Sequence, residues 1–111
     1  MQKPNDIVAE MEVIFEFRGL RKPGSIWIGK PYLRSPGDWR CASGFDGIDE
    51  YWPHVAGGNA FHSLCLSFLC LQFQIKQLLN KEWKIYITRD QHGNPKEIPF
   101  DYNVFFVCDF S

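Results

Sequence analysis

Residues 59–80 constrain the fold of this chain more than any other segment, because they predict one long helix that is apolar on two faces. At about 100° per residue, the first apolar stripe contains Phe61, Leu64, Cys65, Phe68, Leu71, Ile75, Leu78 and Leu79. The second stripe lies roughly opposite and contains Leu66, Leu69, Cys70 and Phe73. One stripe is enough to pack on a sheet. The second must therefore be covered by another part of the chain or by a second molecule.

Around this helix, alternating and apolar runs predict five strands. They cover Met11–Arg18, Ser25–Leu33, Asp38–Phe45, residues 83–88 and Val104–Phe110, and Lys30-Pro31 is an alternative end for the second strand. Turns are expected at 21–24 and 35–38, and a hairpin loop is expected at 90–95. The predicted fold is α+β: a mainly antiparallel, curved five-stranded sheet in the order strand, strand, strand, helix, strand, strand, with the long helix packed on it.

The helix is expected to begin at Asn59, whose side chain can accept a hydrogen bond from the free amides of the first turn. Its expected contacts with the sheet are Phe61, Leu64, Phe68, Leu71 and Ile75. The 111 residues fit one domain, 1–111, in which residues 1–10 are expected to be a flexible end.

Charge and cysteine usage narrow the class of protein. The net charge of −1 argues against nucleic acid or an anionic membrane as the partner. The N-terminus lacks the basic and apolar runs of a signal peptide, and polar residues interrupt the helix too often for a membrane span. A cytoplasmic protein is therefore expected. The four cysteines show no CxxC spacing, which predicts free thiols and no metal pair.

No catalytic or cofactor motif stands out. An acid–base pair could join His54 or His62 to the acids at 46–50, but this rests only on closeness along the chain. Residues 44–50 also lack the alternating ligands of a calcium loop. We therefore expect no catalytic residue, no metal and no cofactor, and a protein that is not an enzyme.

The loop at 46–52 is the expected partner-binding segment. It brings together acids and large aromatic side chains: Asp46, Asp49, Glu50, Tyr51 and Trp52. Aromatic residues are enriched at interface hot spots, and acids can complement a basic partner. The alternative is that Trp52 closes the end of the core while the acids face water. The second helix stripe offers a further surface, because it could form the interface of a homodimer.

Four short motifs give the chain a family resemblance. They are Phe-Arg-Gly-Leu at 17–20, Ile-Gly-Lys-Pro-Tyr at 28–32, Asp-Trp-Arg-Cys at 38–41 and Gly-Asn-Ala-Phe-His-Ser-Leu at 58–64. Over roughly residues 12–80 the chain resembles a family of small bacterial domains of unknown function, which carry a Trp-x-Cys strand before the helix. Asn59 stands where that family usually has Asp, and His62-Ser63 where it has Gln-Ala.

Such domains are similar in type to the immunity proteins encoded beside polymorphic or contact-dependent growth-inhibition toxins. The resemblance implies a cytoplasmic protein that neutralises a cognate toxin domain by direct binding. Two alternatives stay open from the residues themselves. One is a homo-oligomeric scaffold or adaptor, and the other, less favoured, is a small-ligand binder or enzyme.

Overall fold

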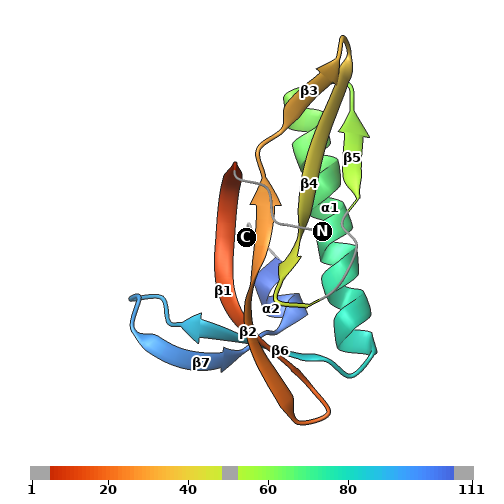
Figure 1. Ribbon diagram of the computed structural model, residues 1–111. Helices are drawn as coiled ribbons and strands as arrows, with labels where there is room; N and C mark the ends of the chain where they lie inside the picture. The colour runs from red at the N-terminus through yellow and green to blue at the C-terminus, as the bar shows by residue number, and fades with distance from the viewer. Residues whose placement is uncertain (1–5, 49–52, 107–111) are drawn as a thin grey trace, which may run out of the picture.

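The computed structural model describes residues 6–48 and 53–106. Within them the chain forms a sheet, one long helix and one short helix (Figure 1). In chain order the elements are β1 (Ile7–Phe17), β2 (Leu20–Gly29), β3 (Tyr32–Ser35), β4 (Asp38–Asp46), β5 (His54–Gly57), α1 (Ala60–Asn80), β6 (Lys84–Arg89), β7 (Pro95–Pro99) and α2 (Tyr102–Phe106). The predicted α+β class, with an antiparallel sheet and one long helix packed on it, is confirmed. The described residues contain seven strands, however, and not the predicted five.

The hairpin of β1 and β2 forms the centre of the sheet. The chain reverses at Arg18 and Gly19, whose φ angles are 52° and 80°, as in a two-residue turn that matches the twist of its strands. The turn predicted at 21–24 is therefore wrong, because these residues extend β2 in register with β1. β1 begins at Ile7, so it includes part of the 1–10 segment that was expected to be a flexible end.

Three strands, β2, β3 and β5, pair with β4. The order across the sheet is β3-β4-β2-β1-β6-β7, and β5 also pairs with β4. β2 pairs with β4 as far as Ser43, and β3 takes over from Arg40. Arg40 also pairs with Ala56 of β5, so β3 and β5 lie on opposite edges of β4. Of the strand predicted at Ser25–Leu33, β2 ends at Gly29, directly before the alternative end at Lys30-Pro31, because proline cannot donate to a ladder; residues 32–33 belong to β3.

The C-terminal region differs most from the prediction. The expected hairpin loop at 90–95 is present between β6 and β7, where the Asp90 carboxylate accepts from the amides of His92 and Asn94 at 2.9 Å each. The strand predicted at Val104–Phe110 is wrong as far as the described residues reach, since residues 102–106 form α2 and 107–110 lie outside them. The backbone oxygen of Asp101 accepts from the Phe105 amide at 2.9 Å, which closes this helical turn.

The core lies between the sheet and α1. Phe15 is fully buried, and its ring contacts Phe45 edge-on at 5.6 Å between centroids. The buried apolar residues of the core cluster are Val13, Phe15, Ile26, Trp27, Ala42, Phe45, Leu71, Ile75, Leu78, Ile85 and Phe100. Only three of them belong to α1, so the helix contributes its C-terminal half to the core and much less of its N-terminal half.

Candidate functional site

α1 lies against β4 and β5 at one side of the sheet (Figure 1). Its N-cap is Asn59, as predicted, and the Asn59 side chain accepts from the His62 amide at 2.8 Å. The buried residues of the helix are Ser63, Ser67, Leu71, Ile75 and Leu78. The two serines are fully buried, and the Ser67 carbonyl accepts from the Ser43 hydroxyl of β4 at 3.1 Å.

This buried face corrects the predicted packing. Phe61 and Phe68 were expected to contact the sheet, yet 75 % and 42 % of their surfaces are exposed. Relative to the first predicted stripe, the helix is rotated by about 60° toward Ser63 and Ser67. The physical reason is the close approach of β5: a Cβ on Gly57 would lie 2.5 Å from the Ser63 amide nitrogen. Only small side chains fit at such a contact, and the large ones turn outward.

The outward-facing residues form a continuous strip, which we call the α1 apolar surface. It consists of Phe61, Cys65, Phe68, Leu69 and Phe73, which are all exposed. The strip combines three residues of the first predicted stripe with two of the second. Leu69 and Phe73 are 58 % and 62 % exposed, whereas Leu66 and Cys70 of the proposed homodimer face are half-buried. The sheet therefore does not cover the second stripe as a whole.

A groove beside the α1 apolar surface extends it toward β1 and β2. The groove has a volume of about 490 Å³ and is lined by Val8, Ile28, Leu64, Cys65, Phe68 and Leu69. The ring of Phe68 meets Phe106 of α2 edge-on at 5.9 Å, so α2 borders this region. All six lining residues are apolar or cysteine. The exposed apolar area thus runs from the helix onto the start of β1.

The predicted partner-binding segment is described only at its first residue. Asp46 ends β4, opposite Ser25 of β2, and is exposed. Asp49, Glu50, Tyr51 and Trp52 lie outside the described residues. The histidines considered for acid–base chemistry have other hydrogen-bond partners, because His54 bonds to Tyr32 and His62 accepts from the Gly58 amide.

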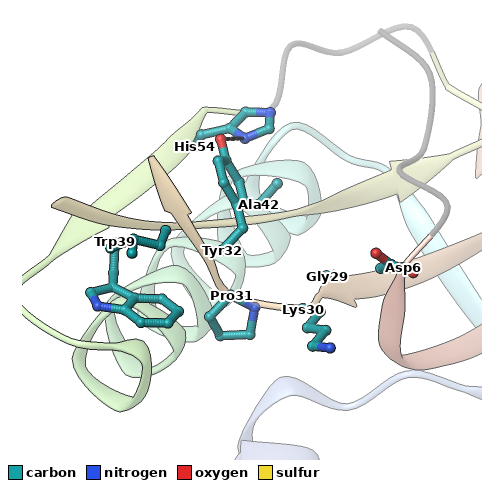
Figure 2. A pocket seen from close by; sticks show the side chains of 9 residues that line it. Asp6, Gly29, Lys30, Pro31, Tyr32, Trp39, Ala42 and His54 are labelled. Atoms are coloured by element: carbon teal, nitrogen blue, oxygen red, sulfur yellow. Dashed lines mark hydrogen bonds between the residues drawn. The ribbon is translucent and has the colours of Figure 1, made fainter. Parts of the chain in front are cut away.

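A second concave site opens where β2 gives way to β3 (Figure 2). This pocket, which we call the β3 pocket, has a volume of about 610 Å³. It is lined by Asp6, Gly29, Lys30, Pro31, Tyr32, Leu33, Trp39, Ala42 and His54. Figure 2 shows Tyr32 reaching toward His54 beside Ala42, with Trp39 and Asp6 at opposite sides. The Tyr32 hydroxyl and His54 Nδ1 are 2.7 Å apart and form a hydrogen bond.

The sequence prediction missed this pocket. The sequence feature that pointed to it was Pro31, which ends the pairing of β2 next to aromatic residues. The sequence alone did not show which strand would face the gap that Pro31 leaves between β2 and β3. Register supplies the answer. Tyr32 pairs with Arg40, and His54 pairs with Ala42. Arg40 and Ala42 are two residues apart on β4, so they lie on the same face of the sheet. Because paired residues share a face, Tyr32 and His54 lie on that face as well.

Three titratable groups on β4 have shifted pKa values, and one of them is Arg40, whose pKa is raised by its hydrogen bond to the Asp38 carboxylate. The hydrogen-bonded Arg40 guanidinium, whose Nε lies 2.8 Å from the carboxylate of Asp38, lowers the pKa of Asp38. Burial raises the pKa of the Cys41 thiol, which donates to the Gly29 carbonyl at 3.3 Å. Full burial and a raised pKa both disfavour the thiolate of Cys41, which is the reactive form of a cysteine.

No group of His, Cys, Asp or Glu in the described ranges could hold a metal ion. None of the helices within these ranges is both long enough and apolar enough to cross a membrane. No protein-family model, curated protein or solved structure matches the chain. The site must therefore be interpreted from its own residues.

Proposed function

We propose that this protein acts stoichiometrically by binding another protein through the α1 apolar surface. The observation that carries the proposal is the exposure of Phe61, Leu69 and Phe73, at 75 %, 58 % and 62 %, along one side of one helix. Single exposed apolar residues are common on proteins, but a contiguous strip of exposed apolar side chains marks an interaction site. Phenylalanine is also enriched in protein interfaces.

The free energy that burial of these side chains would release favours an interface over a surface that stays in water. Moving one large apolar side chain from water to a buried site contributes about 1.5–3 kcal/mol. Three such residues that are more than half exposed can therefore supply several kcal/mol, enough to offset part of the cost of about 4–15 kcal/mol for association. The fold itself gains nothing from these side chains facing water.

The immunity role expected from the family resemblance is a specific form of this proposal. Its partner would be a toxin domain, with the α1 apolar surface providing contact area and the acids Asp46, Asp49 and Glu50 providing charge complementary to a basic toxin. Charge reversal of these acids to lysine should leave the fold intact, slow association with the toxin and reduce protection of cells that express it. Equal protection by the parent and the triple variant would remove the acids from the interface.

A homodimer is the second candidate, because the exposed strip follows one helix and could pack against its own copy across a two-fold axis. Sedimentation equilibrium over a wide concentration range separates the two candidates. A homodimer interface requires association that Phe73→Glu abolishes, since the substitution would bury an unpaired charge. A monomer at all concentrations leaves the binding of another protein as the function.

The test of partner binding uses a matched pair of variants. Phe61→Ser/Phe73→Glu removes the two most exposed side chains of the α1 apolar surface, and Leu20→Glu changes a residue of similar exposure, 73 %, at the β1–β2 turn. A partner captured by the parent is purified and titrated calorimetrically. We expect one-to-one binding that Leu20→Glu keeps and the double variant weakens at least tenfold. Equal affinity for both variants would exclude the α1 apolar surface.

A further inference from the structure

A third hollow lies between the sheet, α1 and α2, and we call it the α2 pocket. It has a volume of about 160 Å³. Its floor is formed by Ala9 and Met11 of β1 and by Ile26 and Ile28 of β2. Met11 pairs with Ile26, and Ala9 pairs with Ile28. Paired residues share a face of the sheet, and so do residues two apart on a strand, so these four side chains lie on one face.

Helical side chains form the walls of the α2 pocket above this floor. Leu71 and Ile75 of α1 form one wall, and both are buried. Phe105 and Phe106 of α2 form the other wall. The Phe106 ring meets Phe68 of α1 edge-on at 5.9 Å, so aromatic contact joins the two walls. The pocket is therefore surrounded by apolar side chains from two helices and a sheet.

Glu10 is the charged residue among the described residues that line the α2 pocket, but its carboxylate lies elsewhere. Glu10 pairs with Trp27, and both alternate with the floor residues, so their side chains lie on the opposite face of the sheet. There the Glu10 carboxylate accepts from the Ser25 hydroxyl at 2.6 Å. A polar group placed in the pocket would thus lose its hydrogen bonds to water without gaining a side-chain partner.

The α2 pocket adjoins the groove beside the α1 apolar surface, because Ile28 and Phe68 line both. The groove, with its volume of about 490 Å³, continues from there to Val8 and Leu69, which are 55 % and 58 % exposed. The two hollows together form one elongated apolar site. It runs from the surface of the protein to the buried side chain of Leu71.

The shape and lining of this site select one class of occupant. A peptide strand would bring backbone N–H and C=O groups that the apolar walls cannot satisfy. A helix is about 10 Å wide, too wide to enter a pocket of about 160 Å³. An unbranched alkyl chain carries no polar group along its length, and it can bend past the Phe68 ring from the groove into the pocket.

We propose that the α2 pocket and the adjoining groove bind the alkyl chain of a free single-chain amphiphile, such as a long-chain alcohol. The methyl end lies in the α2 pocket, the middle of the chain lies in the groove beside Val8, and the polar head stays in water. Chain length, and not the charge of the head, sets the affinity. This ligand site goes beyond the proposed protein binding, although Cys65, Phe68 and Leu69 belong to both the groove and the α1 apolar surface.

The test titrates alcohols into the full chain labelled with ¹⁵N and follows amide chemical shifts. The probes are 1-hexanol, 1-octanol and 1-decanol, with cyclooctanol as a compact probe of equal carbon number to 1-octanol. We expect saturable shifts at the residues of both hollows, and each added CH₂ should tighten binding by up to about fourfold. Cyclooctanol should bind more weakly than 1-octanol, because a ring cannot extend through both hollows. Octyl sulfate and octylammonium, which carry one chain with opposite charges, should bind alike.

Variants of two exposed alanines decide whether the chain enters the α2 pocket. Ala9→Leu fills the pocket from its floor and should weaken binding of 1-decanol by about tenfold, as if two CH₂ groups were displaced. Ala56→Leu changes an exposed alanine of β5 that lines neither hollow, and it should leave binding unchanged. Val8→Ser should weaken 1-decanol more than 1-hexanol, because only the longer chain fills the groove. Circular dichroism checks the fold of each variant.

Four outcomes would overturn the proposal. The first is the absence of saturable shifts with 1-decanol. The second is equal affinity for cyclooctanol and 1-octanol, which would show apolar contact without a preference for an extended chain. The third is an Ala9→Leu variant that binds 1-decanol as the parent does. The fourth is binding to phosphatidylcholine vesicles without binding of the free alcohols, which would assign the apolar residues to a membrane surface.

These results are separable from those on protein binding. Ala9 and Val8 lie outside the α1 apolar surface, and Phe61 and Phe73 line neither hollow. Phe61→Ser/Phe73→Glu should therefore leave the affinity for 1-decanol unchanged while it weakens binding of a protein partner. Ala9→Leu should have the opposite pair of effects.

Discussion

At the scale of single residues, Asn59 shows how one side chain starts an element. Its carboxamide oxygen accepts from the His62 amide at 2.8 Å, and its backbone oxygen accepts from the Ser63 amide at 3.1 Å. We expect Asn59→Ala to lower the free energy of unfolding by about 1 kcal/mol. Asn59→Ser should lower it much less, because serine is also a good N-cap. Urea unfolding measures both. An Asn59→Ala variant as stable as the parent would contradict the capping role.

Cys41 and Cys65 allow a second comparison at this scale. Cys41 is fully buried, whereas Cys65 is exposed within the α1 apolar surface. Peptide mapping after brief treatment with iodoacetamide at neutral pH should find Cys65 modified and Cys41 protected. Adding denaturant should make the two react alike. Early modification of Cys41 in the native protein would show that β4 is more open than described.

Burial raises the pKa of Cys41 in the folded protein, and the sign of the resulting pH dependence follows. Above about pH 8.5 the unfolded thiol loses its proton while the folded one keeps it, so the unfolded state binds fewer protons. The contribution of Cys41 to stability is therefore fully present below that pH and falls as the pH rises. The stability difference between the parent and Cys41→Ala should shrink from pH 8 to pH 10. A constant difference would contradict this prediction.

At the scale of elements, the approach of β5 to α1 determines which helix face is buried. A Cβ on Gly57 would meet the backbone of Ser63, whereas a Cβ on Gly58 would meet nothing within 4 Å. Gly57→Ala should therefore destabilise the fold by about 1–3 kcal/mol, as overpacking does. Gly58→Ala is the neighbouring control and should change stability by no more than about 0.5 kcal/mol. Denaturation midpoints of the two variants provide the test, and equal midpoints would contradict the close contact.

The helix also shows what the sequence could predict and what it could not. The span of α1 and its cap followed from local chemistry, because apolar spacing and Asn59 act within a few residues. The buried face did not follow, because Ser63 and Ser67 look like polar interruptions of an apolar stripe. Ser63 lies against Gly57 of β5 and Ser67 against Ser43 of β4, so their burial depends on where these strands place themselves against α1. The same reason hid the β3 pocket, whose lining comes from separate strands.

Short strands were missed for a different reason. β3 has four residues, all exposed, and β7 carries a proline at each end. Neither offers the alternation of buried and exposed side chains by which strands are recognised. α2 was missed because its apolar sequence suits a buried strand equally well, and only its contacts with Phe100 and Phe68 distinguish the two.

At the scale of the whole molecule, the apolar residues divide between a core and a surface. The Cα radius of gyration is 14.8 Å, larger than the value of about 13 Å usual for this length. The β3–β4 and β6–β7 hairpins extend away from the centre (Figure 1). A chain spread in this way cannot cover every face of α1, and the α1 apolar surface is the part left in contact with water.

This division predicts unequal effects of two phenylalanine substitutions. Phe15 is fully buried and Phe61 is 75 % exposed. Phe15→Ala should lower the free energy of unfolding by about 3–5 kcal/mol, and it removes the contact with Phe45. Phe61→Ala should change it by no more than about 0.5 kcal/mol in the absence of a partner. Similar losses for both would mean that Phe61 is covered in solution, for example by a second copy.

The shared strand β4 has a consequence for how the native state opens. Trp39 and Arg40 are flanked by β3 on one edge and β5 on the other, and the flanking strands are only four residues long. Short outer strands with few buried side chains detach at low free energy, while the hairpin of β1 and β2 stays closed. In native-state hydrogen exchange, β3 should exchange its amide protons long before β1.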